Sequence, residues 1–391
     1  MNKKNKVLFL LGDIWSLGKN KGMPSIFKVL ENSDESFDTT IFTTDKNEYS
    51  KELPNSTVFY FQNEFSTFSK NRYLIYLNVR VSNLVLNLKY IYKFIKLKDK
   101  FDVVYCSSSI PIYATWFIRK FYKVKTIHRI YGTFLYPNLS SKLDKIKKFE
   151  EVLSFKLKAD KYIITNDGTY GDKVAEYFNI KSDKILFIRN GVDKIDVNKD
   201  EIKSRFKLNE NHFNCMCVSR LVGWKRVDRI VSAFNKIDNS SIKLYVIGDG
   251  EELDRLKELS INENIIFLGS LPSSDVHGLM NCMNCFISMY DISNVGNPLL
   301  EALVYNMPII TYNSGNTKDV INEKNGILIE SSNEETIIDE LYQYIIEFYK
   351  NKTLVDKLSK GAEEYAKNNL YSWNKRIDIE IQEIEKVCGE R

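Results

Sequence analysis

The chain has 391 residues, more than one hydrophobic core ordinarily organises, so two domains are expected. Its hydrophobic content of 43% and charged content of 27% are typical of a globular protein and exclude a largely disordered chain. The sequence contains no uninterrupted run of about 18 apolar residues, so no transmembrane helix is predicted. No apolar stretch follows Met1–Lys4 either, so we expect no signal peptide and a cytoplasmic location.

Charge is distributed unevenly along the chain. The net charge is +5, but residues 51–150 alone carry 18 Lys and Arg against 6 Asp and Glu. Such a concentration predicts a surface that meets an anionic lipid or polymer. A lysine-rich surface that merely aids solubility explains the same numbers equally well.

Strand-like and helix-like segments alternate through the first half. Helix-like segments include residues 140–157 and 170–178. Short apolar runs between polar residues predict strands at 6–11, 39–44, 57–61, 102–106, 125–131, 161–165 and 185–189.

Residues 73–97 form the longest helical segment of that half. Its many Leu, Ile, Val and Tyr residues are mixed with Asn and with the basic residues Arg80, Lys89, Lys93 and Lys96. One interpretation is an interfacial helix whose lysine stems lie along acyl chains. The interpretation we favour from sequence is a core helix with one solvated face.

The second half repeats the alternation and ends in a long helical tail. Residues 333–391 contain no further strand. Strands are predicted at 213–219, 243–247, 265–268, 285–289, 309–312 and 327–329. Alternation of this kind predicts parallel sheets covered on both faces, and two such series predict an α/β protein of two doubly wound, Rossmann-like domains.

A turn signal at residues 190–193, Asn-Gly-Val-Asp, follows a predicted strand and indicates the boundary. We expect a first domain at 1–194, a second at 195–370, and a last helix at 371–391 that crosses back to pack on the first domain.

The six cysteines do not predict a metal site. Cys215 and Cys217 form a Cys-x-Cys, and Cys282 and Cys285 a Cys-x-x-Cys, spacings that zinc sites also use. Most of these residues fall in predicted buried strands, where small thiols are common. We therefore expect reduced cysteines and no metal.

A glycine-bearing loop follows the first strand, with Gly12, Gly18 and Gly22 ahead of a helix predicted from Pro24. Its backbone N–H groups could approach a phosphate or a substrate. The loop fits neither the G-x-G-x-x-G nor the Walker pattern, and an ordinary loop is an equal alternative.

Two turns of the second half carry ligand-binding chemistry. After the strand at 213–219, Arg220 offers a planar fork and Lys225 a compact ammonium, which together can neutralise a diphosphate. Gly248 opens the Gly-Asp-Gly turn after the next strand. Ligands of open α/β sheets bind at this carboxyl edge.

Residues 293–301 are the most informative segment. Asn297 is a good N-cap and Pro298 suits the first helical position, so a helix is predicted to begin there. Gly296 lets the backbone come close to a ligand, and the free N–H groups of a helix start bind anions. Glu301, one turn in, can accept two hydrogen bonds from a diol. Phosphate beside ribose is what a nucleotide-diphosphate donor presents.

The second half resembles the donor-binding domain of the family 4 retaining glycosyltransferases, which have the GT-B fold of two such domains facing across a cleft. The first half resembles the family more loosely, at residues 12–22 and 129–133. The resembling pieces of the second half, in order, lie at 190–193, 219–225, 247–250, 268–269, 296–302, 308–310 and 325–326.

The resemblance implies roles for matching residues. Arg220 and Lys225 would hold the donor diphosphate and stabilise the leaving-group charge, and Glu301, the third expected catalytic residue, would bind the ribose hydroxyls. Gly22 would line the cleft between donor and acceptor. Such enzymes usually need no metal or other cofactor. The remaining expected donor-binding residues are Gly248, Asn294, Gly296, Asn297, Pro298 and Leu299.

Two positions depart from the family pattern. Ser293 stands where a donor-sugar glutamate is common, and Tyr131 stands where a histidine is common. Asp291 and Asn294 are only partial substitutes for the glutamate. His128 lies near Tyr131 but points to the opposite face of its strand. Ser293, His128 and Tyr131 therefore remain candidates for the sugar or acceptor site.

The resemblance implies a retaining enzyme that moves a sugar from a nucleotide-diphosphate donor, UDP rather than GDP, to a glycan or lipid-linked acceptor in polysaccharide or glycoconjugate assembly. Its expected partners are that donor, that acceptor and an anionic membrane surface met through residues 51–150 at the inner face of the cell membrane, but no nucleic acid.

Two alternatives stay open. One is a GT-B nucleotide-sugar epimerase, which needs groups that move a proton at the sugar ring. The chain has only three histidines and no glutamate at 293, and this speaks against an epimerase. A non-catalytic donor-binding subunit would keep Arg220, Lys225 and Glu301 without transferring sugar.

Overall fold

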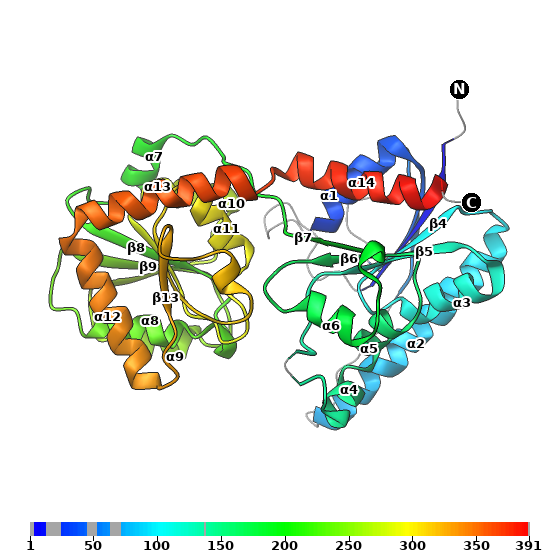
Figure 1. Ribbon diagram of the computed structural model, residues 1–391, viewed down its shortest axis with the longest axis horizontal. Coiled ribbons are helices and arrows are strands. Elements are labelled where there is room, and N and C mark those ends of the chain that lie inside the picture. The colour runs from blue at the N-terminus through cyan, green and yellow to red at the C-terminus, as the bar shows by residue number, and fades with distance from the viewer. Residues whose placement is uncertain (1–3, 13–24, 45–52, 63–71, 137, 390–391) are drawn as a thin grey trace. The chain divides into compact units, whose positions relative to one another are not determined.

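The computed structural model describes residues 4–12, 25–44, 53–62, 72–136 and 138–389. The chain divides into two compact units (Figure 1). Unit 1 comprises 1–166, 170–189 and 374–391, and unit 2 comprises 167–169 and 190–373. The second unit thus resumes at Asn190, five residues before the predicted start of the second domain at residue 195.

Unit 1 is built on a seven-stranded parallel sheet in the order β3-β2-β1-β4-β5-β6-β7. The order reverses beside β1, which pairs with β2 on one side and β4 on the other. The strands are β1 (Lys6–Leu11), β2 (Asp38–Thr43), β3 (Thr57–Tyr60), β4 (Val103–Ser107), β5 (Lys125–Ile130), β6 (Lys161–Thr165) and β7 (Ile185–Ile188).

Helices cover this sheet because its strands carry buried apolar side chains on both faces. One buried cluster joins Leu8 and Val104 of the sheet to α2 and α3, and another joins β6 to α5 and α6. The helices are α1 (Ser25–Ser36), α2 (Arg72–Leu97), α3 (Ile112–Tyr122), α4 (Lys142–Lys147), α5 (Phe149–Lys156), α6 (Gly171–Tyr177), the short η2 (Ser182–Lys184) and α14 (Trp373–Gly389).

The last helix, α14, is anchored to unit 1 through a buried charge cluster. The Glu380 carboxylate accepts from the Tyr105 hydroxyl and pairs with Arg376 at 2.6 Å and with Arg129 at 3.5 Å. Removing one member of such a cluster leaves a buried charge uncompensated, which typically costs about 3–5 kcal/mol. The cluster thereby fixes the register of α14 on the first sheet.

Unit 2 has a six-stranded parallel sheet in the order β10-β9-β8-β11-β12-β13. Its strands are β8 (Phe213–Val218), β9 (Ile242–Ile247), β10 (Ile265–Gly269), β11 (Cys285–Ser288), β12 (Ile309–Tyr312) and β13 (Gly326–Ile329). Its helices are α7 (Lys199–Phe206), η3 (Gly223–Lys225), α8 (Val227–Asn235), α9 (Leu253–Leu259), α10 (Ser273–Met280), α11 (Asn297–Val304), η4 (Thr317–Asp319), α12 (Glu334–Lys350) and α13 (Lys352–Asn369).

Alternate side chains of β8 enter opposite cores of unit 2, as the period of a strand requires. Cys215 and Cys217 pack with α8 and α12, whereas Met216 packs with α10 and α11. Both faces of the sheet are therefore buried.

The predicted fold class is confirmed. Every predicted strand is present, with its ends moved by at most one residue. The helix predicted at 140–157 is instead two, because the backbone leaves helical geometry at Lys148 (φ −110°, ψ 39°) between α4 and α5. In the described parts of the chain, we find no helix long and apolar enough to cross a membrane.

Candidate donor site in unit 2

The candidate residues of unit 2 gather where the strand order reverses. β8 pairs with β9 on one side and with β11 on the other, so the turns after these three strands meet at one sheet edge. Arg220 and Lys225 follow β8, Gly248 follows β9, and residues 293–301 follow β11. Such a switch point is where open α/β sheets bind ligands.

The two cations at this edge interact electrostatically but lie in different environments. Arg220 is exposed, whereas the ammonium of Lys225 lies 3.6 Å from the ring centre of Tyr290 and 4.0 Å from that of Trp224. Burial and then the charge of Arg220 lower the pKa of Lys225 to about 7, although Asp167 opposes the shift. A dianionic ligand would favour the protonated lysine and bind between the two cations.

The turn at Gly248 is set by close backbone packing. The amide of Ser219 donates to the carbonyl of Ile247, and that of Leu221 donates to Asp249, so the two turns continue the pairing of β8 with β9. Gly248 has φ +136°, and a Cβ atom there would overlap the carbonyl oxygen of Ser219. Gly248 therefore positions the Arg220 turn, a structural reason for glycine that its sequence pattern did not reveal.

We expect Gly248→Ala to lower the free energy of unfolding by about 2–4 kcal/mol, because the methyl group meets backbone at a positive φ. Denaturant unfolding measures the change. Gly223→Ala is the matched control, since a Cβ atom at Gly223 meets no atom within 4 Å and needs no unusual φ. Equal stabilities of the two variants would contradict this interpretation.

The predicted cap of α11 is wrong in detail. Gly296 is the N-cap, Asn297 is the first helical residue, and Pro298 follows it within the first turn. The side-chain oxygen of Asn297 instead accepts a hydrogen bond from the side-chain amide of Asn190 at 2.9 Å. Pro298 has no N–H group and the Leu299 N–H donates to the Gly296 carbonyl, so the donors that the helix start can offer an anion are the N–H groups of the half-buried Gly296 and Asn297.

Glu301 lies one turn into α11 and is half-buried. Burial raises the pKa of its carboxyl to about 7. Its carboxylate has no ion pair or hydrogen bond with the parts of the chain that the structure describes. A carboxyl desolvated in this way gains from a ligand that donates hydroxyl hydrogen bonds. Leu299, by contrast, is buried in the core, and its N–H already donates to the Gly296 carbonyl.

Asn294 and Ser293 hold the loop between β11 and α11. The Asn294 side chain is fully buried, donating to the carbonyl of Tyr312 at 2.7 Å and accepting from the Tyr290 amide at 3.0 Å. Ser293 donates to the carbonyl oxygen of Asp167. Neither side chain is presented to a ligand, so any contact they make would come from their backbone.

A segment that the sequence analysis missed closes this loop. Residues 167–169 leave the first sheet and sit on unit 2, where the carbonyl of Gly168 accepts from the Asn316 amide at 3.0 Å. Gly168 has φ +83°, and a Cβ atom there would overlap the Ser293 hydroxyl, which explains the glycine at position 168. The segment also brings the charge of Asp167 to Lys225. Ser293 and Asp167 are 126 positions apart in the sequence, so no local sequence pattern could have predicted their contact.

Asp291 is occupied elsewhere. Its carboxylate pairs with Arg229 at 2.8 Å and with Arg226 at 3.3 Å, and Glu334 pairs with the same two arginines. It therefore supports the base of the loop and does not substitute for the missing glutamate.

The two unit 1 candidates differ in access. His128 is buried, its Nδ1 lies 2.9 Å from the Ser154 carbonyl oxygen, and burial lowers its pKa to about 4. A ring held this way cannot contact a ligand, so its candidate site role is not supported. Tyr131 is half-buried at the carboxyl end of β5 and shares a 2.7 Å hydrogen bond with Ser107. Gly22 lies outside the described residues.

The described residues contain no cluster of three or more His, Cys, Asp or Glu arranged to hold a metal ion. All six cysteines are free, and Cys215, Cys217 and Cys285 are buried in strands.

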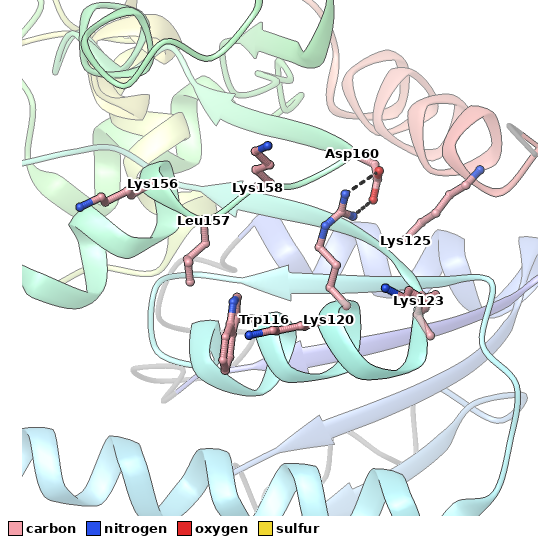
Figure 2. A pocket seen from close by; sticks show the side chains of 10 residues that line it. Trp116, Lys120, Lys123, Lys125, Lys156, Leu157, Lys158 and Asp160 are labelled. Carbon is pink, nitrogen blue, oxygen red and sulfur yellow. Dashed lines mark hydrogen bonds and ion pairs between the residues drawn. The ribbon is translucent and has the colours of Figure 1, made fainter.

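Unit 1 has a basic hollow of about 520 Å³ at the amino edge of its sheet, where β5 and β6 begin (Figure 2). Arg119 is held there by Asp160, which also accepts from the Thr126 amide at 2.8 Å. The hollow lies where α3 and α5 end, and the negative partial charge of helix C-termini accounts for the lysines. Lining lysines are Lys120, Lys123, Lys125, Lys156 and Lys158.

Two family profiles match the chain. Residues 37–194 match the profile described as Glycosyltransferase Family 4, and residues 198–368 match Glycosyl transferases group 1. The chain belongs to the family 4 glycosyltransferases. The second match covers every donor-site candidate of unit 2 from Arg220 to Glu301.

Curated relatives agree over shorter stretches. The chain is 28% identical over 224 residues, 54% of its length, to an uncharacterised glycosyltransferase of Methanocaldococcus jannaschii. It is 26% identical over 32% of its length to the alpha-monoglucosyldiacylglycerol synthase of Streptococcus pneumoniae, and 30% identical over 35% to a capsular polysaccharide biosynthesis glycosyltransferase of Staphylococcus aureus. These matches span 56%, 30% and 37% of the relatives' own lengths.

Among solved structures, Anabaena HepE in complex with UDP and glucose has a TM-score of 0.73 at 16% identity, with 98% of this chain and 99% of that chain covered. This likeness shows that the whole chain has the GT-B type of fold.

Proposed function

We propose that this protein is a retaining glycosyltransferase that takes a sugar from a nucleotide-diphosphate donor, with UDP as the nucleotide. The observation that carries the proposal is the convergence of Arg220, Lys225, the start of α11 and Glu301 at one switch point of unit 2. Two cations and a helix start suit a diphosphate, and a desolvated carboxyl suits ribose hydroxyls. The UDP in the HepE complex supports the choice of nucleotide.

The chemistry follows from stabilising a departing diphosphate. The bond from the sugar C1 to the diphosphate oxygen breaks as a C1–O bond forms to the acceptor hydroxyl, and the leaving diphosphate takes the hydroxyl proton. Arg220, Lys225 and the N–H groups of α11 stabilise the charge that develops on the diphosphate. The residues of unit 2 supply these cationic groups themselves, and we propose that no metal is needed.

The proposed acceptor is a glycan or a lipid-linked glycan at the membrane face. The relatives that synthesise a glucosyl lipid and capsular polysaccharide support this class. The excess of basic residues in 51–150 supports an anionic membrane surface as a partner.

The proposal is tested by incubating the protein with labelled UDP-sugars and a membrane lipid extract, followed by NMR of the product. We expect a new glycoside that keeps the anomeric configuration of the donor. An inverted product would overturn the retaining mechanism. Interconversion of sugar nucleotides without acceptor would establish an epimerase, and donor binding without transfer to any acceptor would establish a binding subunit.

We expect the affinity for UDP-glucose to be greatest near pH 7. Burial places the pKa of both Lys225 and Glu301 at about 7, so the lysine loses its charge above this pH and the carboxylate loses its charge below it. Calorimetric titration from pH 6 to 9 measures the profile. Lys225→Arg should remove the alkaline limb, because a guanidinium stays charged throughout. A flat profile in the unaltered protein would contradict the pKa assignment.

A further inference from the structure

Helix α2 turns an apolar face outward from unit 1. Its exposed large apolar residues, each 43–59% exposed, are Leu77, Val79, Val81, Leu84, Val85, Leu88, Tyr92 and Ile95. Most of them recur at spacings of three and four residues, so they form a continuous stripe along the helix. The sequence-based interpretation of a core helix with one solvated face agrees with this arrangement, but the solvated face is largely apolar.

The opposite face of α2 is firmly seated in the core and partly polar. Tyr90 is fully buried and donates to the carbonyl of Leu11 at 2.6 Å. Asn87 is also buried, donating to the carbonyl of Ile110 and accepting from the amide of Ala114, each at 2.8 Å. These hydrogen bonds fix the rotation of the helix, so the apolar stripe cannot turn inward without leaving them unpaired.

Charge on this helix has one sign. None of its 26 residues is Asp or Glu, whereas Lys89 and Lys96 are exposed beside the stripe. Lys93 lies with its ammonium 3.7 Å from the ring centre of Phe59, and Lys98 and Lys100 follow the helix on the surface. Apolar stripe and cationic edge together match the interface of an anionic bilayer.

A second exposed apolar surface adjoins the first half of α2. Arg80 donates to the carbonyl of Ile146 and lies 3.8 Å from the carboxylate of Glu150, which ties α2 to α4 and α5 (Figure 1). Leu143 and Ile146 of α4 are 70% and 58% exposed. Like α2, the short α4 combines exposed apolar and lysine side chains.

We propose that the outer face of α2, extended by Leu143 and Ile146, is a docking surface for an anionic phospholipid bilayer. An exposed apolar stripe of this length marks an interaction site. A second copy of this chain fits less well, because its lysines would face those of the first. The inference names the partner surface of the proposed transferase and so rests on the proposed function for its biological purpose, but not for its test.

Vesicle flotation tests the proposal with the full chain. We expect the protein to float with vesicles of phosphatidylglycerol and phosphatidylcholine and to stay at the bottom with phosphatidylcholine alone. The double variant Leu84→Gln with Leu88→Gln should reduce partitioning about tenfold or more. Lys89→Gln with Lys96→Gln should reduce it by a similar factor. Controls in unit 2, Ile261→Gln and Lys357→Gln with Lys360→Gln, also change exposed apolar and lysine residues and should float normally.

Two results would overturn the docking surface. One is flotation that is equal with both vesicle types, or flotation of the α2 variants that equals that of the unaltered protein. The other is a dimer in gel filtration that Leu84→Gln with Leu88→Gln converts to monomer, since a second copy would then cover the stripe. UDP-glucose titration of the same samples separates the proposals: donor binding without flotation removes only the docking surface, and flotation without donor binding removes only the proposed function.

Discussion

Arg220→Ala and Lys225→Ala are each expected to lower the turnover number by about a hundredfold or more, while the protein folds normally. In the proposed mechanism both cations act on charge that grows as the diphosphate leaves, so their loss should cost transition-state stabilisation of about 2–4 kcal/mol. Turnover at saturating donor, measured by released UDP with acceptor present, gives the effect directly.

Lys225→Met separates the charge of this residue from its packing. Methionine keeps an unbranched chain between Trp224 and Tyr290 but carries no charge, so its turnover should match that of Lys225→Ala. Lys257→Ala, an exposed lysine of α9, is the control and should remain fully active. Near-normal turnover in Arg220→Ala or Lys225→Met would remove the diphosphate assignment.

Glu301→Gln is expected to raise the KM for the donor about tenfold to a hundredfold with a smaller change in kcat, because a carboxylate accepts stronger hydrogen bonds from ribose than an amide does. Stability should not fall at pH 8, since burial raises the pKa of Glu301 to about 7 and the ionised carboxyl there is the costly form. Initial rates over a donor series measure KM, and urea unfolding measures stability.

A 2′-deoxyribose donor identifies the contact of Glu301. The unaltered protein should bind this donor more weakly than UDP-glucose, whereas Glu301→Gln should bind the two donors nearly alike, because the shared hydrogen bond is already weakened. An equal loss in both proteins would show that Glu301 contacts something other than the ribose.

The sheet strands and the loops at the switch point could be predicted from sequence because both depend on local patterns. Buried parallel strands appear as short apolar runs, and Arg220 and Glu301 follow such runs at the expected carboxyl edge. The start of α11 was predicted one residue late, since Asn and Gly are both common caps.

Other features depend on tertiary contacts and could not be predicted. The burial of His128 against Ser154 and the fit of Ser293 under Gly168 join segments far apart in the chain. The outward apolar face of α2 could not be predicted because large apolar residues lie on both sides of the helix. The buried hydrogen bonds of Asn87 and Tyr90 show which side faces the core.

The most direct test of the donor site is a thermal-shift titration against UDP-, GDP- and ADP-sugars in the presence of EDTA. We predict that a UDP-sugar raises the melting temperature without metal, and that Arg220→Ala abolishes the shift while Lys257→Ala keeps it. No shift with any sugar nucleotide, or the same shift in Arg220→Ala, would contradict a donor site at the switch point of unit 2.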